Sequence, residues 1–356
     1  MQTKITKKID FSGKNLFIGL DVHSKSWQVT IFCQEMFLKT FNQPPIAEVL
    51  YNYLISNYPK ANYFSAYEAG FSGYSHHRKL IQMGVKNIVV NPADIPRTNK
   101  DCHRKTDKSD SKLIAESLKS GLLKPIHVFD PDSEEFRSLF RSRLALAKDI
   151  RRTKCRIKSF LAYRNIDIPS EFERNSRSSK YINWLSGMKL PDTKTVFQIS
   201  LLTNRLLFLN NQRRVLEQQL RDIAKSRDKG LFKLLLSVPG IGPVTAIGIM
   251  AEIGNIERFH NIKQFASYVG LIPRIKQSGE NQRVGSITYR NNNYLRPLLI
   301  EAAWQAVRAD PAMLLYYQNH CLKGNAKKAI VKVARKLLSK IMFVMRNRTI
   351  YERGIR

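Results

Sequence analysis

The sequence predicts an α/β protein with a mixed sheet near its N-terminus and a mainly helical remainder. Up to about residue 130, short β-rich runs alternate with helical runs, whereas later apolar residues recur at helical spacing. After Lys229 the composition shifts again, to short helices interrupted by glycines. We therefore predict three domains, at residues 1–130, 131–228 and 229–356.

The first domain is predicted to open with an antiparallel hairpin. Residues 16–32 read LFIGLDVHSKSWQVTIF, an apolar run, a polar break at 23–26 and then an alternating β-rich run. A third short strand is expected at 36–41. Next come a helix at 46–58, a strand at 63–68, a helix at 74–83 and a strand at 86–90, followed by a further helix.

The central domain is predicted to contain two long helices. The first, at 133–161, is rich in basic residues between Arg141 and Lys158. This stretch contains eight Lys or Arg and one acid, Asp149. Such one-sided charge favours a phosphate track over a solvated helix face. The residues expected to contact nucleic acid there are Arg151, Arg152 and Lys154.

The second long helix carries the apolar spacing of a coiled coil. Its partner could be the first helix, across residues 169–191, or another chain, and we favour a linker that also helps oligomerisation. The alternating three- and four-residue spacing is interrupted by Arg213 and runs through Ile199, Leu202, Leu206, Leu209, Leu216, Leu220 and Ile223.

Composition points to a nucleic-acid partner. Sixty Lys and Arg against 28 Asp and Glu give a formal net charge of +32, which attracts a polyanion by phosphate contacts and counterion release. No stretch reaches the roughly 20 apolar residues of a membrane-spanning helix. The four cysteines are far apart in the sequence, which indicates free thiols in a reducing compartment. We therefore expect a cytoplasmic, nucleoid-associated protein. The cysteines are Cys33, Cys102, Cys155 and Cys321.

Four carboxylates form the predicted metal site. Asp21 ends the first strand, Glu68 ends a later one, and Asp107 and Asp110 lie where a helix is expected to begin. Taken singly, Asp110 could be a helix N-terminal charge and Glu68 a surface acid. Acids from separate strands and one helix can instead hold one or two Mg²⁺ ions, as in the ribonuclease H type of fold.

Two features of the third domain point to DNA. The run LSVPGIGPVTA at 236–246 is typical of a helix-hairpin-helix, in which Gly240 and Gly242 let the backbone approach a phosphate, although a plain structural turn has the same pattern. Ser278 follows in a polar loop and could attack phosphorus, although most loop serines do nothing of the kind. The cations around it are Arg274, Lys276, Arg283, Arg290 and Arg296.

Together these motifs resemble the transposase and invertase family typified by the Piv invertase and insertion sequence 110. The motifs that match, in order, are GLDVHSK, YEAG, KTDKSDSKLIA, SVPGIGPVTA, GLIPRIKQSG and YLRPLLIEAAW. The resemblance implies an N-terminal RuvC-like domain whose Asp21, Glu68, Asp107 and Asp110 bind Mg²⁺. It also implies a C-terminal transposase domain whose Ser278 forms a transient phosphoserine link to DNA, a homo-oligomer (dimer or tetramer), and guidance by a structured RNA.

One departure from the family pattern is visible. Where the family usually carries a Lys and then a Gly before the Leu-Arg pair, this chain has Thr288-Tyr289-Arg290-Asn291. Asn tolerates the left-handed backbone that Gly would supply, and Arg290 could replace the charge. Ser286 is a second serine nearby, ranked below Ser278.

The sequence thus predicts a site-specific DNA recombinase that acts on donor and target DNA. Two alternatives stay open at this point. One is a Holliday-junction-type metal nuclease in which water attacks and Ser278 is idle. The other is a non-catalytic nucleic-acid-binding scaffold.

Overall fold

The structure is a computed structural model that describes residues 10–97, 106–173, 179–188, 192–278, 281–322 and 324–353. The chain forms two compact units, Met1–Val128 and Phe129–Arg356. The long central helices therefore belong to the same unit as the C-terminal helices.

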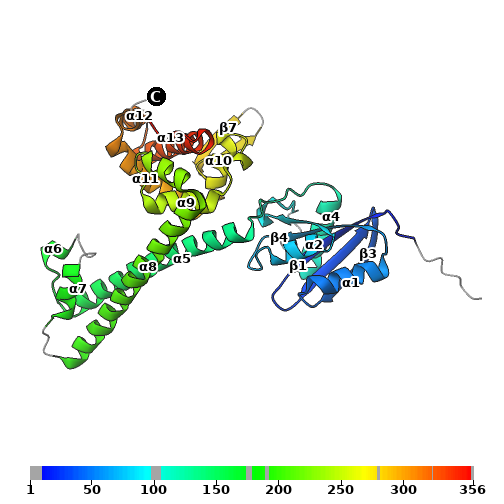
Figure 1. The fold of residues 1–356 in the computed structure, drawn as a ribbon, viewed down its shortest axis with the longest axis horizontal. Helices are drawn as coiled ribbons and strands as arrows, with labels where there is room; N and C mark the ends of the chain where they lie inside the picture. The colour runs from blue at the N-terminus through cyan, green and yellow to red at the C-terminus, as the bar shows by residue number, and fades with distance from the viewer. Residues whose placement is uncertain are drawn as a thin grey trace, which may run out of the picture. The chain divides into compact units, whose positions relative to one another are not determined.

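The first unit contains a five-stranded mixed sheet (Figure 1). The strands run in the order β3-β2-β1-β4-β5, in which β1 pairs antiparallel with β2 and parallel with β4. The predicted succession of strands and helices is confirmed. The elements are β1 (Asn15–Val22), β2 (Trp27–Cys33), β3 (Met36–Gln43), α1 (Ala47–Asn57), β4 (Asn62–Glu68), α2 (Ser75–Gln82), β5 (Lys86–Val90), η1 (Pro92–Asp94) and α4 (Asp107–Lys119).

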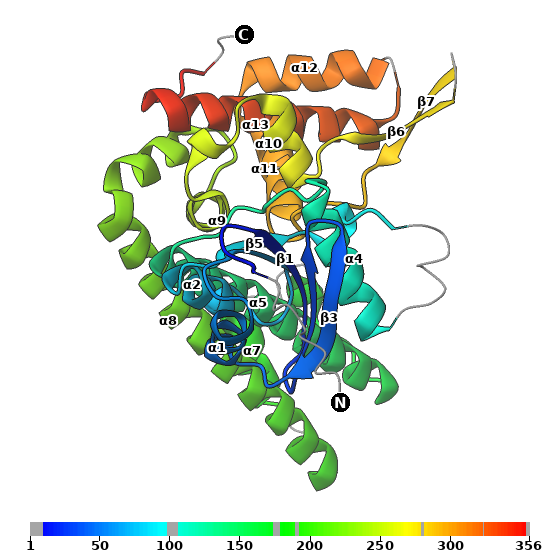
Figure 2. The same cartoon turned by 90° about the vertical axis from the view of Figure 1, so that its right-hand side faces the viewer.

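The two faces of β1 are buried by different helices. Side chains alternate along a strand, and Leu16, Ile18 and Leu20 all join the core shared with α1 and α2. Gly19 faces the other way, toward α4, which lies on the opposite side of the sheet (Figure 2). A Cβ on Gly19 would stand 2.0 Å from the backbone oxygen of Ser111. Only glycine therefore allows α4 to approach the strand this closely.

The start of α4 is fixed by its own residues and by the sheet. Thr106 is the N-cap, and it exchanges hydrogen bonds with Ser109 in a capping box. One turn later the Ser111 hydroxyl lies 2.8 Å from that of Thr30 in β2, and both side chains are buried. These contacts determine where the first turn of α4, with Asp107 and Asp110, meets the end of β1.

The second unit begins with two long helices that pack against each other within the chain (Figure 1). They are α5 (Pro131–Tyr163) and α8 (Thr193–Ser237), with the short helices α6 (Ser170–Glu173) and α7 (Ser179–Ser186) between them. The predicted seam is buried or half-buried in two cores, one shared with α7 and one shared with the C-terminal helices. A coiled-coil contact with another chain stays a prediction.

The rest of the second unit is helical apart from one hairpin. A shared core includes Leu235 of α8, Phe265, Ala303 and Leu337. The elements are α9 (Pro243–Ile253), η2 (Ile256–Arg258), α10 (Ile262–Val269), β6 (Pro273–Ser278), β7 (Asn281–Ile287), α11 (Leu295–Ala309), α12 (Pro311–Leu322) and α13 (Ala326–Asn347).

The predicted polar loop around Ser278 is instead part of a β-hairpin, so that prediction was wrong. Ser278 is the last residue of β6 and pairs in register with Asn281 of β7. Figure 2 shows the hairpin extending away from the helices of its unit. The apolar residues of these strands lie in different surroundings: Ile275 of β6 is 57% exposed, whereas Ile287 of β7 packs against the helical core. The two strands are defined by their backbone hydrogen bonds, which hydrophobic periodicity does not predict.

Among the described residues, no helix combines the length and the apolar character needed to cross a membrane.

Candidate active site

Asp21 and Glu68 lie at the same end of two neighbouring strands. β1 and β4 are parallel, and their register pairs Leu20 with Tyr67. Each acid stands one residue beyond that pair, so the two carboxylates leave the same edge of the sheet. The parallel pairing that brings them together follows from the crossover through α1.

Asp107 and Asp110 approach the same edge from the first turn of α4. The two residues are three apart on the helix and thus share one face. Burial raises the pKa of Asp21; the charge and hydrogen bond of His23 lower it, and the negative charges of Asp107 and Asp110 raise it further. The three acids are therefore close enough to repel one another.

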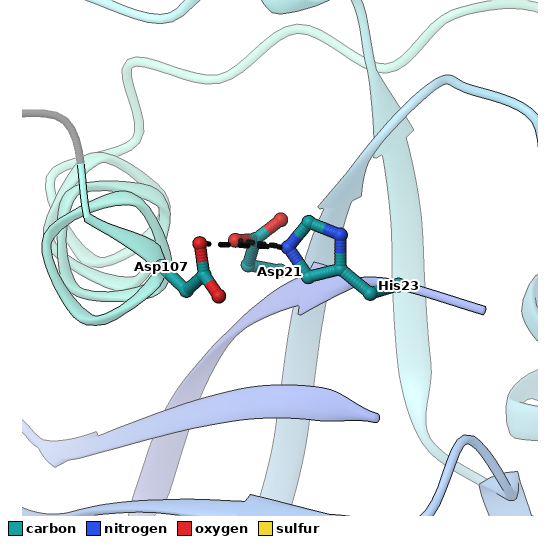
Figure 3. Close-up of side chains that lie close together, drawn as sticks. All are labelled: Asp21, His23 and Asp107. Atoms are coloured by element: carbon teal, nitrogen blue, oxygen red, sulfur yellow. Dashed lines mark hydrogen bonds and ion pairs between the residues drawn. The ribbon is translucent and has the colours of Figure 1, made fainter. Parts of the chain in front are cut away.

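His23 completes one half of the site (Figure 3). Its Nε2 lies 3.1 Å from Oδ2 of Asp21 and 3.6 Å from Oδ1 of Asp107. One ligand atom from each of these three residues can be chosen so that all lie within 4.8 Å of one another. Sequence reasoning assigned His23 only to the turn between strands; its place two residues after Asp21 was the available signal.

Arg97 occupies the other half of the site, and sequence reasoning missed it. Its guanidinium lies 2.8 Å from Oε1 of Glu68 and 3.7 Å from Oδ1 of Asp110. A single cationic side chain therefore joins the acid of β4 to an acid of α4. Arg97 belongs to the stretch after η1, and nothing in its local sequence distinguishes it from the other arginines of a basic chain.

The residues of the first half fit a divalent cation. Asp21 is half-buried and repelled by its neighbours, so its ionised form is disfavoured until a positive charge arrives. Two carboxylates and one imidazole nitrogen are a donor set that divalent metals accept. Glu68 and Asp110 already face one guanidinium, which offsets one of their two negative charges without a metal.

In the second unit, the base of the β6–β7 hairpin is packed tightly. Gly270 adopts a left-handed conformation, and a Cβ there would stand 2.2 Å from the Cβ of Asn291. Arg296 donates to the carbonyl oxygens of Gly270 (3.3 Å) and Thr288 (2.6 Å). The side-chain oxygen of Asn292 accepts from the amides of Tyr294 and Leu295 at the start of α11.

The residues of the hairpin that were predicted to contact nucleic acid lie in different surroundings in the structure. Arg296 holds the hairpin base, and Arg274 donates to the Ser286 hydroxyl at 2.6 Å with its guanidinium over the Tyr289 ring. Arg290 is exposed. Lys276 and Arg283 are register partners in β6 and β7, but their side chains lie outside the described residues, as does that of Ser278.

The predicted phosphate track on α5 is shorter than the sequence suggests. Arg141 pairs with Glu252 at 2.6 Å, and Arg143 pairs with Glu217 at 2.6 Å, so both charges serve the fold. Arg151 and Arg152 are exposed and Lys154 is half-buried, and Arg152 lies 3.4 Å from Asp149 of the same helix. Helical periodicity could not separate these two groups, because their partners lie far away in sequence.

The PGIG turn connects α8 to α9, and its two glycines differ. A Cβ on Gly240 would stand 2.1 Å from the backbone oxygen of Ala302 in α11, so packing within the chain already requires glycine there. Gly242 is the N-cap of α9, and no atom lies within 4 Å of where its Cβ would be. A phosphate contact by either glycine stays a prediction.

A RuvC-like domain with an acidic edge, joined to a basic helical unit, defines the class of nucleic-acid-processing proteins that carry an Asp-Glu-Asp-Asp site. Two family models match the chain. Residues 18–164 match a model for DEDD transposases of the IS110 type, and residues 232–318 match the model for the Transposase IS116/IS110/IS902 family.

Relatives agree with these matches. A putative transposase, y4rJ, of Sinorhizobium fredii is 30% identical over 76% of this chain and 74% of its own length. Another from the same organism, y4qE, is 28% identical over 68% of this chain and 58% of its own length. The transposase for insertion sequence element IS1111A of Coxiella burnetii is 25% identical over 66% of this chain and 64% of its own length. The chain therefore belongs to the IS110 family of transposases, although its match spans less than two thirds of two of these relatives.

Proposed function

We propose that this chain cuts and rejoins DNA as the recombinase of a mobile element. The observation that carries the proposal is the acidic edge of the sheet, where Asp21, Asp107 and Asp110 are close enough to raise the pKa of Asp21. Carboxylates that lie this close together repel one another. A metal ion bound to phosphate relieves that repulsion.

We infer that Asp21, Asp107 and His23 hold one divalent cation, with Mg²⁺ as the expected ion. Glu68 and Asp110 complete the acidic set, and Arg97 offsets one of their two negative charges. When bound, the ion supplies a Lewis acid that polarises the scissile phosphate. The chain's own residues orient that phosphate and balance the charge that develops on it.

The proposed nucleophile is Ser278, at the end of β6. Its hydroxyl oxygen attacks phosphorus, the bond from phosphorus to one DNA sugar oxygen breaks, and the serine proton ends on that leaving hydroxyl. Attack by the hydroxyl of another strand then reverses these bond changes and frees the serine. Because each step exchanges one phosphoester for another, rejoining needs no external energy source.

Further parts of the proposal rest on the family resemblance. They are guidance by a structured RNA and assembly as a dimer or tetramer. The sequence patterns alone support phosphate contacts by the PGIG turn acting as a helix-hairpin-helix, and a coiled-coil domain at 131–228 between domains 1–130 and 229–356. The exposed Arg151 and Arg152 and the charge of +32 support contact with nucleic-acid backbones.

The deciding experiment compares Ser278→Ala with the native chain on DNA carrying the ends of its own element. We expect the native chain to give a covalent protein–DNA adduct that survives denaturation, with the DNA mapped to the peptide containing Ser278. Ser278→Ala should bind the same DNA without forming the adduct.

Two outcomes would replace the proposal. If Ser278→Ala cleaves at the native rate, water is the nucleophile and the chain is a metal nuclease. If neither protein responds to Mg²⁺ or Mn²⁺ while both bind DNA, the chain is a binding scaffold.

A further inference from the structure

A row of three lysines on α13 faces rings of the neighbouring segments. Lys332, Lys336 and Lys340 are four residues apart, so they lie on one face of the helix at intervals of about 6 Å. Each Nζ has an aromatic partner. Lys332 lies 3.4 Å from Nδ1 of His320, Lys336 lies 5.6 Å from the ring centre of Tyr316, and Lys340 lies 5.8 Å from that of Tyr351.

Two of these lysines line a pocket between α12 and α13. The pocket has a volume of about 260 Å³, and its walls include Tyr316, Asn319, Lys336, Lys340 and Tyr351. That volume is below the roughly 300 Å³ at which pockets for drug-sized ligands begin. It suits one flat group rather than a folded segment.

The charge of the two helices that line this pocket is positive. Neither α12 nor α13 contains an Asp or Glu, whereas α13 carries seven Lys or Arg. Within the described part of the chain, Lys332 and Lys336 form no ion pair. Asp310, just before α12, is buried and already accepts from the Tyr351 hydroxyl at 2.5 Å and from the amide of Ala312. The ammonium groups of Lys332 and Lys336 are therefore available to an external anion.

We infer that this pocket binds one nucleotide of a single-stranded nucleic acid. The base stacks on the Tyr316 ring beside Lys336, and the adjacent phosphates are held by the lysine row. The Asn319 amide offers both a donor and an acceptor to the edge of that base. A paired, stacked base cannot enter a pocket between two helices, so the ligand is single-stranded. The inference rests on the proposed function only in assuming that the chain handles nucleic acid.

The test uses two matched pairs of substitutions on one helix of the full-length protein. Lys336→Gln with Lys340→Gln alters the pocket, whereas Lys327→Gln with Lys328→Gln removes the same charge from exposed positions outside it. The probes are a fluorescently labelled 12-nucleotide single strand of DNA, the same sequence as RNA, and the DNA duplex. Binding is followed by fluorescence anisotropy at several salt concentrations.

We expect the pocket pair to weaken single-strand binding about tenfold and to reduce the salt slope by about 1.4, since each phosphate contact contributes roughly 0.7. The control pair should change binding less than about threefold. Tyr316→Leu should weaken single-strand binding at least fivefold, whereas Tyr316→Phe, which keeps the ring, should bind as the native chain does. The stronger of the DNA and RNA probes identifies the natural source.

Photocrosslinking of a 5-iodouracil probe gives a direct readout, with the expected crosslink at Tyr316 or Tyr351. Equal losses in both lysine pairs would overturn the inference, as would a crosslink that maps elsewhere. If the pocket pair instead lost binding to phosphatidylserine vesicles while oligonucleotide binding stayed unchanged, the surface would be a membrane site. These binding assays involve no cleavage, so their result is separate from the Ser278→Ala experiment.

Discussion

The acidic edge of the first unit and the serine hairpin of the second are built in opposite ways. Asp21 and Glu68 end strands of a five-stranded sheet, and α4 is pressed onto that sheet at Gly19. Ser278 is the last residue of the first strand of a hairpin whose base is fixed by contacts of Gly270, Asn291 and Arg296. The acids are held by a packed core, whereas the hairpin is held by contacts at its base.

The two regions therefore depend on different kinds of contact for their geometry. Carboxylates that share an ion must keep their spacing, and a packed core maintains spacing because it cannot deform cheaply. A hairpin anchored at its base has its orientation set by those contacts. Glu252 sits beneath that hairpin, fully buried, where it accepts from Arg137 and Arg141 of α5 and from Asn292. It joins the long helix to the hairpin base.

Asp21→Asn is expected to have the greatest effect, and it distinguishes the role of the Asp21 charge in catalysis from its role in stability. Asp21→Asn should lower DNA cleavage by about 1000-fold, equivalent to roughly 4 kcal/mol in the barrier, because a metal ligand is lost. Its thermal stability should not fall, because the raised pKa of Asp21 means that its ionised form already opposes folding at neutral pH. Cleavage assays and calorimetry measure the two effects.

Glu116→Gln is the matched control, an exposed acid on the same helix as Asp107. It should cleave at nearly the native rate. An equal loss of activity in both variants would show that total charge matters and the acidic edge does not.

The next effect concerns Glu252, beneath the hairpin. Burial alone would raise its pKa, but the hydrogen bond from Arg141, the charge of Arg137 and the hydrogen bond from Asn292 hold that pKa below its usual value. Glu252→Gln leaves two arginines without their partner, so unfolding free energy should fall by about 3 kcal/mol. Urea unfolding at neutral pH measures this loss.

The pH dependence follows from the same shift. Because the folded pKa is depressed, the stability due to Glu252 is present above its unfolded value of about 4.3 and is lost as pH falls through the folded value. The gap between native and Glu252→Gln proteins should therefore shrink in acid. Glu217→Gln, which breaks the half-buried pair with Arg143, should cost less than about 1 kcal/mol.

A third expected effect tests the contact that positions α4. Gly19→Ala inserts a Cβ where backbone atoms of Ser111 and Ala115 already lie, so stability should drop by about 2 kcal/mol. Metal affinity should fall with it, because Asp107 and Asp110 move with the helix. Gly70→Ala has its nearest contact at 3.9 Å and should be neutral in both urea unfolding and metal titration.

Arg97→Gln is expected to have a smaller effect, on metal binding by the half of the site that contains Glu68 and Asp110. Arg97→Gln frees Glu68 and Asp110 from their guanidinium. We expect Mn²⁺ to bind about tenfold tighter and with a higher stoichiometry, as measured by electron paramagnetic resonance of the free ion. Lys79→Gln, which breaks a surface pair with Glu48, should leave the titration unchanged. An Arg97→Gln titration identical to the native one would contradict the assignment of Arg97 as an internal counterion.

Much of this molecule was predictable from local sequence. The strands of the first unit, the long helices and the start of α4 at Asp107 follow from periodicity and from turn and cap residues, because these signals act over a few residues. The convergence of Asp21, Glu68, Asp107 and Asp110 could also be anticipated, since acids at strand ends meet at a sheet edge.

The kind of each secondary-structure element and the surplus of positive charge follow from the sequence alone, and that surplus predicts a polyanionic partner. The three-dimensional fold was needed to show that His23 and Arg97 pair with different acids of the edge, that Arg141 and Arg143 serve the fold, and that Ser278 ends a strand. The reason is physical: a charge has no set role until folding selects its partner, and that partner can lie more than a hundred residues away.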